Sequence, residues 1–213
     1  AFELARIADM NEEIFGPVLH VVRWGGEVDT VVDQVNALGY GLTLGVQTRI
    51  DSRAARIADT ARIGNVYVNR NMIGAVVGVQ PFGGEGLSGT GPKAGGPHYL
   101  DRFTPLPWLA GNGEASLFGQ RAGLPAPDLE GLRKAFPAWS IRPLAERVLA
   151  LRSMATPLVD QAAMMLADQV LPGPTGESNT LRLRARGVFA LLAQGASTSE
   201  TATALAAALV AGN

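Results

Sequence analysis

The sequence predicts an α/β fold with a mainly parallel sheet, followed by a second, partial α/β unit. Two observations support this prediction. In the first hundred residues, short β-branched runs alternate with segments whose apolar residues recur at helical spacing. Further on, residues 104–127 are rich in proline and glycine and interrupt this pattern, before helical spacing returns.

The first strand is expected at residues 18–24 (VLHVVRW), a short run with several valines. A helix should follow at residues 28–38, because its apolar residues fall three or four positions apart and Gly39 is a natural C-terminal stop. These apolar residues are Val28, Val31, Val32, Val35 and Leu38.

The next three elements repeat this order. Residues 42–48 (LTLGVQT) alternate like a strand, and Asp51 or Ser52 can cap the following helix. Gly64 is expected to end that helix before a strand at residues 65–69 (NVYVN). The resulting β-α-β-α-β order implies parallel strands with right-handed crossovers.

Three regions follow from the composition: a first domain at residues 1–103, a linker at 104–127 and a second unit at 128–213. In the second unit, residues 141–169 are long and amphipathic, and Pro157 should kink or divide them.

The rest of the second unit is expected to hold two strands and a final helix. The strands are predicted at residues 180–186 (TLRLRAR) and 188–194 (VFALLAQ). Ser197 or Thr198 can cap an alanine-rich helix that extends to Ala211.

The composition excludes several classes of function. The 213 residues are 47% hydrophobic and carry a net charge of −1, without a basic stripe, so a nucleic-acid surface is not expected. With no cysteine and two distant histidines, neither a disulfide nor a metal site is expected. No apolar stretch is long enough to span a membrane and the N-terminus shows no signal peptide, which favours a cytoplasmic protein.

The most distinctive segment is residues 81–97 (PFGGEGLSGTGPKAGGP), where 7 of 17 residues are glycine. Glycine is favoured where the backbone takes a positive φ or approaches another group closely. A surface linker is the alternative, although Phe82 and Leu87 are unusual in a linker. In parallel α/β sheets, ligands bind beyond the carboxyl ends of the strands, where residues 70–80 and this loop begin.

Three segments, in this order and spacing, resemble the aldehyde dehydrogenase superfamily: residues 13–18 (EIFGPV), 67–71 (YVNRN) and 81–91 (PFGGEGLSGTG). The fuller run, residues 69–100, looks most like the L-glutamate gamma-semialdehyde (pyrroline-5-carboxylate) dehydrogenase module of the bifunctional proline utilization A family. The resemblance spans roughly residues 1–103, and a weaker similarity to that family's C-terminal domain continues beyond it.

The resemblance implies a fragment of a longer enzyme. In the family, the catalytic cysteine, the general-base glutamate, the oxyanion-binding asparagine and most of the NAD-binding half lie before the EIFGPV motif, which agrees with the absence of cysteine here. The implied parent oxidises glutamate semialdehyde to glutamate with NAD and associates as a homo-oligomer. FAD would belong only to an upstream proline dehydrogenase module.

The resemblance also assigns roles to five residues. Glu13 corresponds to the family glutamate that binds the nicotinamide ribose hydroxyls, and Phe15 would pack near the nicotinamide. Gly74 and Ala75 match the loop that anchors the substrate carboxylate through backbone amides, although some relatives carry Ser at the Ala75 position. Phe82 matches the aromatic residue along the aliphatic part of the substrate. Glu13 and Phe15 also have a purely structural interpretation, as a helix-end carboxylate and a core aromatic, and Gly74 and Ala75 as a turn required only by packing.

Two further residues in the loop are expected to be structural. Ser88 should support the loop rather than act as a nucleophile, because the G-x-S-x-G spacing of a nucleophile elbow is not met. Lys93 should face solvent or anchor the loop.

Three hypotheses follow. The first is a piece of an NAD-dependent glutamate semialdehyde dehydrogenase that contributes a ribose contact and a substrate anchor and is inactive alone. The second is a noncatalytic scaffold or interaction protein with an aldehyde dehydrogenase-like fold. The third is an α/β small-molecule binder whose glycine loop holds an anion.

Overall fold

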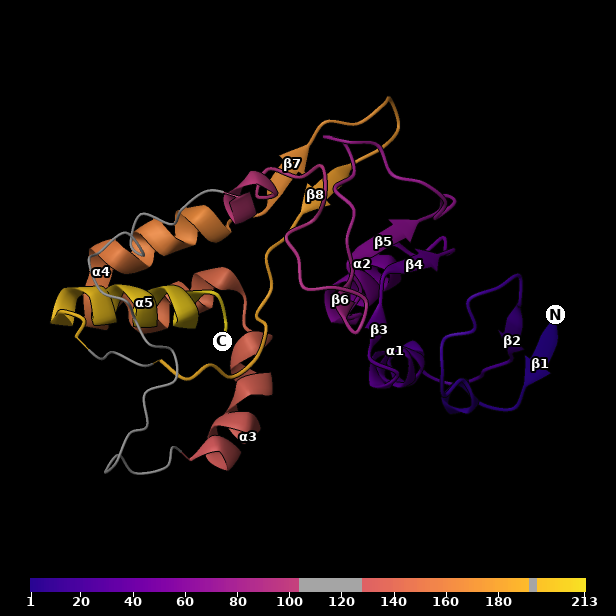
Figure 1. The fold of residues 1–213 in the computed structure, drawn as a ribbon, viewed down its shortest axis with the longest axis horizontal. Coiled ribbons are helices and arrows are strands. Elements are labelled where there is room, and N and C mark those ends of the chain that lie inside the picture. The colour runs from indigo at the N-terminus through magenta and orange to yellow at the C-terminus, as the bar shows by residue number, and fades with distance from the viewer. Residues whose placement is uncertain (104–127, 192–194) are drawn as a thin grey trace. The chain divides into compact units, whose positions relative to one another are not determined.

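The computed structural model describes residues 1–103, 128–191 and 195–213 (Figure 1). The chain divides into two compact units, Ala1–Gly111 and Asn112–Asn213. The predicted linker, residues 104–127, lies outside the described residues.

The first unit combines short strands with two helices, which confirms the predicted α/β class. Its elements in chain order are β1 (Phe2–Leu4), the 3₁₀ helix η1 (Ile7–Asp9), β2 (His20–Val22), α1 (Val28–Ala37), β3 (Tyr40–Gly41), β4 (Thr43–Val46), α2 (Asp51–Thr60), β5 (Asn65–Val68), β6 (Glu85–Gly86) and the 3₁₀ helix η2 (Leu100–Phe103).

The strands of the first unit form three pairs, of which two are parallel. Strands β4 and β5 run parallel, with Val46 opposite Val68, as the crossover order predicts. Strand β2 pairs in parallel with β1, an N-terminal strand that the sequence pattern did not reveal, and among the described residues it does not pair with β4, so the first of the two predicted crossovers is wrong. The third pair is antiparallel and joins β3 to β6 in the glycine loop, so this loop is hydrogen-bonded to the body of the unit.

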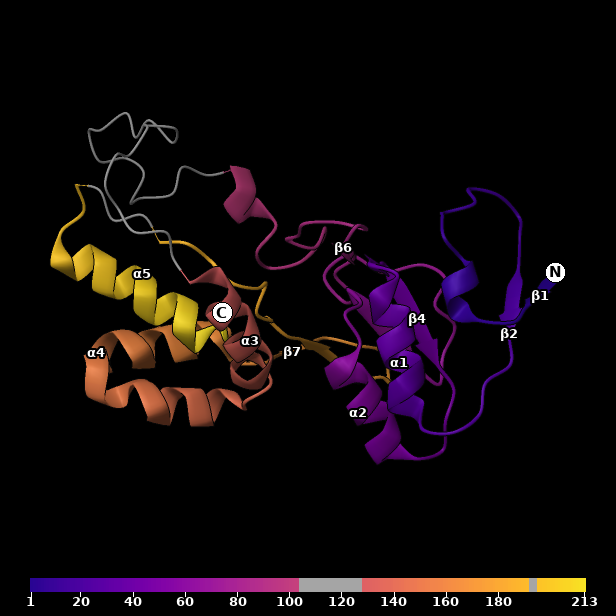
Figure 2. The same ribbon diagram turned by 90° about the horizontal axis from the view of Figure 1, so that it is seen from below.

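The core of the first unit lies where α1 and α2 pack on β4 and β5, as the valine pattern of residues 28–38 predicts. The two helices lie side by side (Figure 2). The buried apolar side chains of this core are Val32, Val46, Ile57, Ala61 and Ile63. Because β4 and β5 pack on this core, the core holds the ends of these strands in place, and the loops that follow them start from a rigid scaffold.

The ends of α2 differ from the prediction. The helix begins at Asp51 with Ile50 at the N-cap and no side-chain capping bond, so neither Asp51 nor Ser52 is the cap. Asp51 instead lies in the first turn, where its carboxylate interacts favourably with the positive end of the helix dipole. The helix ends at Thr60, because the fully buried Ala61 already has extended backbone. Gly64 therefore does not terminate the helix.

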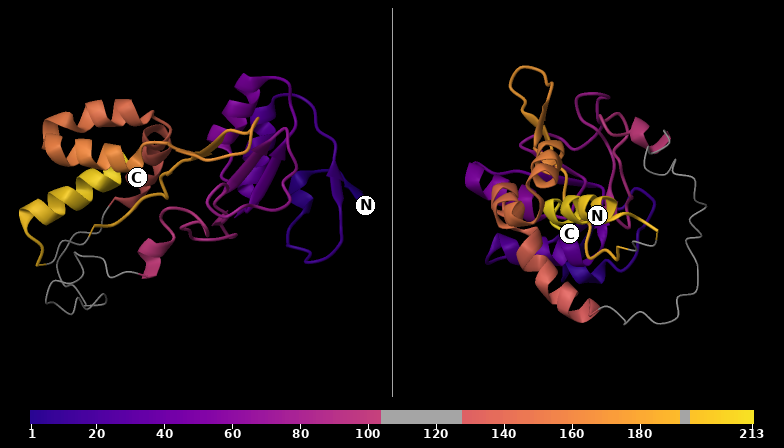
Figure 3. Two further views of the ribbon diagram at one scale, coloured as in Figure 1. Left: turned by 90° about the horizontal axis from the view of Figure 1, so that it is seen from above. Right: turned by 90° about the vertical axis from the view of Figure 1, so that its left-hand side faces the viewer.

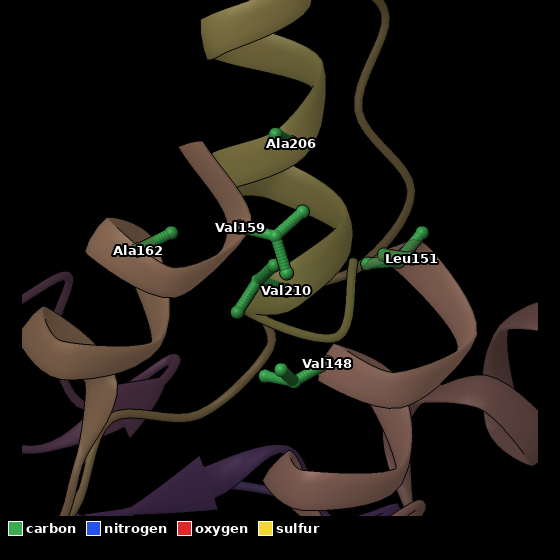
Figure 4. Close-up of a cluster of buried hydrophobic side chains, with 6 residues drawn as sticks. All are labelled: Val148, Leu151, Val159, Ala162, Ala206 and Val210. Carbon is green, nitrogen blue, oxygen red and sulfur yellow. The ribbon is translucent and has the colours of Figure 1, made fainter. Parts of the chain in front are cut away.

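The second unit is mainly helical. Its elements are α3 (Leu129–Ser140), α4 (Leu144–Leu166), the antiparallel pair β7 (Gln169–Leu171) and β8 (Asn179–Leu181), and α5 (Thr198–Val210). The core lies between α4 and α5 (Figure 4) and contains Val148, Leu151, Val159, Ala162, Ala206 and Val210. Pro157 lies within α4, and the ribbon turns sharply along this helix (Figures 2 and 3), in agreement with the predicted kink.

Side chains from α3 and α4 donate hydrogen bonds to carbonyls at the ends of α5 and α3. The indole Nε1 of Trp139 in α3 donates to the Leu209 carbonyl at 3.0 Å. The guanidinium of Arg147 in α4 donates to the carbonyls of Val210 (2.9 Å) and Ser140 (3.3 Å), and burial lowers the pKa of this group. These bonds pair carbonyls that a helix end leaves unsatisfied.

Several predictions in the second unit are wrong. Helix α3 was not expected, and residues 167–169 leave the predicted helix, with Gln169 starting β7. The strand predicted at 180–186 ends at Leu181, while residues 188–191 of the predicted strand 188–194 are not a strand and residues 192–194 lie outside the described residues.

The final helix is confirmed. Ser197 is its N-cap and forms a reciprocal capping box with Glu200, which holds the pKa of the Glu200 carboxyl below its usual value. Within the described ranges, no helix is both long and apolar enough to cross a membrane.

Candidate functional site

The candidate site is built on the loop that leaves the carboxyl end of β5. Asn69 begins this loop with φ of 56°, a left-handed conformation that asparagine tolerates better than most residues. Its side-chain oxygen accepts a hydrogen bond from the amide of Thr48 at 2.9 Å, and Gln47 donates to the Arg70 carbonyl at 3.1 Å. The start of the loop is thus fixed by the end of β4, at the edge where parallel sheets bind ligands.

The predicted anchor residues Gly74 and Ala75 lie in the exposed part of this loop. Gly74 has φ of 80°, and within the described residues no atom approaches its missing Cβ within 4 Å. Buried Gln80 closes the loop, because its side-chain oxygen accepts from the Val76 amide at 3.2 Å while its backbone amide donates to the Val76 carbonyl at 2.8 Å. Gln80 was not among the residues predicted for the site from the sequence.

The glycine loop packs against the same edge. The amide of Gly78 donates to the Gly95 carbonyl at 3.0 Å, which joins the anchor loop to the glycine loop. The Leu87 amide donates to Gly39 at 2.9 Å, next to the β3–β6 pair. The loop is therefore a packed part of the unit and not a linker, as its apolar residues suggested.

Ser88 and Lys93 have the structural roles that were predicted for them. The Ser88 hydroxyl accepts a hydrogen bond from the Gly41 amide at 3.0 Å. The ammonium of Lys93 donates to the carbonyls of Gly64 and Gly83, so it anchors the loop to the start of β5.

Phe82 lies at the start of the glycine loop, directly after the loop that carries Gly74. Its backbone forms a two-bond antiparallel bridge with Ala94, with N···O distances of 3.0 and 2.8 Å. The side chain is 36% exposed, which leaves part of the ring open to a ligand.

Glu13 and Phe15 lie in a different segment, between η1 and β2. Two tight turns shape this segment, in which Gly16 donates to the Ile14 carbonyl and Val18 to the Gly16 carbonyl, both at 2.8 Å. Glu13 is exposed, and the Phe15 side chain is 97% exposed.

Three of the five predicted site residues therefore lie in the same part of the first unit. Gly74, Ala75 and Phe82 lie on two loops that hydrogen bonds connect, whereas the segment of Glu13 and Phe15 lies beside β1 and β2, apart from those loops (Figure 1). Across the described residues, no group of three or more His, Cys, Asp or Glu side chains could hold a metal ion.

This α/β architecture and the loops at its strand ends agree with the family comparison. Residues 5–109 match the model of the aldehyde dehydrogenase family, so this part of the chain belongs to an aldehyde dehydrogenase family domain, as predicted. The bifunctional protein PutA of Escherichia coli (strain K12) is 45% identical over 216 residues, which cover 99% of this chain and 16% of that protein. The 1-pyrroline-5-carboxylate dehydrogenase of Bacillus subtilis (strain 168) is 44% identical over 91 residues, covering 43% of this chain and 18% of that protein.

The sequence of one solved structure is also similar to this chain. Bradyrhizobium japonicum proline utilization A (PutA) is 63% identical over 47% of this chain and 10% of its own, with a TM-score of 0.46. The chain thus spans about one sixth of the length of the PutA relative from Escherichia coli, and the match to that protein includes both units.

Proposed function

We propose that the chain is part of an NAD-dependent L-glutamate gamma-semialdehyde dehydrogenase that oxidises this aldehyde to glutamate in proline catabolism. The chain would supply the substrate-carboxylate anchor and a contact to the nicotinamide ribose. The observation that carries the proposal is the exposed segment at Gly74 and Ala75, in which Gly74 has φ of 80°, beyond the parallel β4–β5 pair in a chain similar to PutA and 1-pyrroline-5-carboxylate dehydrogenase.

The anchor fits the chemistry of a carboxylate. Backbone amides in a turn of small residues form a concave site for an anion, and no positively charged side chain is needed. Among the described residues, neither Gly74 nor Ala75 donates its amide to another group of the chain, so both can donate to a ligand. Phe82, 36% exposed at the start of the connected glycine loop, would lie along the aliphatic part of the substrate and orient the aldehyde.

The cofactor contact fits the exposed segment between η1 and β2. A carboxylate such as Glu13 can accept two hydrogen bonds from the vicinal hydroxyls of a ribose, and charge-assisted bonds are the stronger kind. An aromatic ring as exposed as Phe15 offers an apolar face to a planar ligand. NAD, when bound, would accept the hydride from the substrate carbon; the nucleophile would come from outside this cysteine-free chain.

The rest of the organisation is part of the same proposal. Residues 1–103 would be the C-terminal portion of the catalytic domain, residues 104–127 a linker and residues 128–213 the start of a C-terminal aldehyde dehydrogenase-like domain. The complete protein would be a cytoplasmic homo-oligomer, and FAD would belong only to an upstream proline dehydrogenase module.

The anchor is tested by Gly74→Val in the full-length protein that carries this chain, with Gly78→Val as the matched control. Both glycines have a positive φ near 80° and open space at the missing Cβ, so valine meets a similar φ and similar space at both positions. Gly74→Val should raise KM for glutamate semialdehyde about tenfold, which is about 1.4 kcal/mol, and raise KM for propanal far less. Equal effects on the two aldehydes, or equal effects of the two substitutions, would argue against carboxylate anchoring.

The ribose contact is tested by Glu13→Ala, with the neighbouring and equally exposed Glu12→Ala as its control. Losing charge-assisted bonds worth about 1.5–3 kcal/mol should raise KM for NAD roughly ten- to hundredfold. An unchanged KM for NAD in the Glu13 variant would exclude this role.

A further inference from the structure

The backbone on both sides of Phe82 is held by side chains from elsewhere in the unit. The Phe82 backbone itself is fixed by its two hydrogen bonds to Ala94. The groups next to it, the Pro81 carbonyl and the peptide groups of Gly83, are bound by side chains rather than by a strand.

Asn65, the first residue of β5, binds both flanks of Phe82 with one side chain. Its amide nitrogen Nδ2 donates to the Pro81 carbonyl at 2.8 Å, and its oxygen Oδ1 accepts from the Gly83 amide at 3.1 Å. Only a planar amide offers a donor and an acceptor in this arrangement, because a carboxylate would turn an acceptor toward the Pro81 carbonyl. The pair of bonds ties the position of Phe82 to strand β5.

Lys93 completes the arrangement from the other end of the loop. Its partly buried ammonium donates to Gly83 O at 2.9 Å, to Asn65 Oδ1 at 3.2 Å and to the Gly64 carbonyl. A charge withdrawn from water needs such partners, and bonds from a charged donor are stronger than neutral ones. Lys93 also lies next to Ala94, the backbone partner of Phe82.

We infer that Asn65 and Lys93 are positioning residues for the aldehyde substrate, acting through Phe82. The inference rests on the proposed function, in which the Phe82 ring lies along the aliphatic chain of the substrate. The two side chains hold the peptide groups that flank Phe82, so the direction of its Cα–Cβ bond is fixed relative to the parallel strands. Neither residue touches the substrate, and neither contributes to NAD binding.

The test is a double-mutant cycle on kcat/KM in the full-length enzyme, combining Lys93→Met with Phe82→Ala. In the enzyme with Phe82 intact, Lys93→Met should lower kcat/KM for glutamate semialdehyde about tenfold, as loss of one or two charged hydrogen bonds would. In the Phe82→Ala background, the same substitution should change kcat/KM less than about twofold, since no ring remains to be positioned. KM for NAD should be unchanged throughout.

Lys134→Met is the matched control, because Lys134 is the other lysine of the chain and its side chain is 75% exposed on α3. If Lys93→Met does not fold, the cycle is repeated with Asn65→Asp, which keeps the side-chain volume but removes the donor to Pro81. The inference is overturned if Phe82→Ala lowers kcat/KM but Lys93→Met, or Asn65→Asp in its place, has no effect on it. It is also overturned if that second substitution lowers kcat/KM by the same factor with Phe82 present and with Phe82 replaced by alanine. If Phe82→Ala itself leaves kcat/KM unchanged, the proposed role of Phe82 fails, and the inference fails with it.

Discussion

Replacing Gly64 with alanine should loosen the contact between β5 and the glycine loop. A Cβ at this position would lie 2.9 Å from both the Gly83 carbonyl carbon and the Gly84 Cα, and closer still to the Gly83 carbonyl oxygen. Normal carbon contacts are about 3.5–4.0 Å, and backbone atoms cannot rotate away as a side chain can. The glycine loop must therefore move as a whole.

The size of the effect follows from what this movement disrupts. Overpacking costs about 1–3 kcal/mol. The displaced Gly83 would also lengthen its bonds to Lys93 (2.9 Å) and Asn65 (3.1 Å); the charged bond is worth about 1.5–3 kcal/mol and the neutral one about 1 kcal/mol, and lengthening them loses part of this, about 2 kcal/mol. The lower entropy of the unfolded alanine chain offsets about 0.4–1 kcal/mol. The net expectation is a loss of about 2–4 kcal/mol from the free energy of unfolding of the first unit.

The assay is urea unfolding of the chain, followed by circular dichroism, together with hydrogen exchange at the amides of β5. With a typical slope of about 1–3 kcal/mol per molar urea, the midpoint should fall by about 1–2 M. Gly25→Ala is the control, since no atom of the described structure lies within 4 Å of its missing Cβ and its φ suits alanine. If both variants unfold at the same urea concentration, the close approach of the loop to Gly64 is refuted.

Three further predictions concern the second unit. Val159→Ala should lower the free energy of unfolding by about 2 kcal/mol, because the side chain is 1% exposed, whereas Val170→Ala, at an 83% exposed site, should change it little; urea unfolding compares them. Arg147→Met should release the end of α5 and speed hydrogen exchange there, since it removes the donor to the Val210 carbonyl at the end of α5, together with the bonds to Ser140 at the end of α3 and to Arg142 between α3 and α4. Ser197→Ala should cost about 1 kcal/mol at neutral pH. The folded state lowers the Glu200 pKa, chiefly through the Ser197 backbone amide and then through its hydroxyl, so this stability is present above the ordinary glutamate pKa and is lost as pH falls through the folded value. Because Ser197→Ala keeps the amide and removes only the hydroxyl, its cost should shrink only slightly in acid.

The sequence predicted the elements whose side chains form the core. Helix α1 and the β4–β5 pair follow from valines that are buried where helical and strand spacing place them, such as Val32 and Val46. Helix α3 could not be predicted in this way, because Gly131 and Pro137 both break the helical pattern. Gly131 lies in the first turn, where its amide bonds to the Asp128 side chain at 2.8 Å, and Pro137 lies near the end of the helix, so only one turn follows the missing amide donor.

The support of the candidate site could not be predicted from local pattern. Asn65 reaches residues 16 and 18 positions away, and Lys93 reaches a residue 28 positions away, so these contacts exist only after the strand and the loop have packed together. The role of Gly64 could not be predicted from local pattern either. Its place after a helix suggested a terminator, whereas its actual constraint is the backbone of Gly83.

The most exposed apolar side chains of the described first unit lie near the segments that carry the family resemblance. Phe15 is 97% exposed, Ile73 85% and Val77 82%, and all three lie in or beside the segments that resemble the family motifs. Burial in this unit does not explain these residues, since they contribute almost no apolar area to its core. Exposed apolar side chains gathered in such segments are typical of surfaces that contact a ligand or another protein surface. Because they do not line the core, they add nothing to a helical or strand pattern of burial, which is why motifs, and not periodicity, singled out these segments.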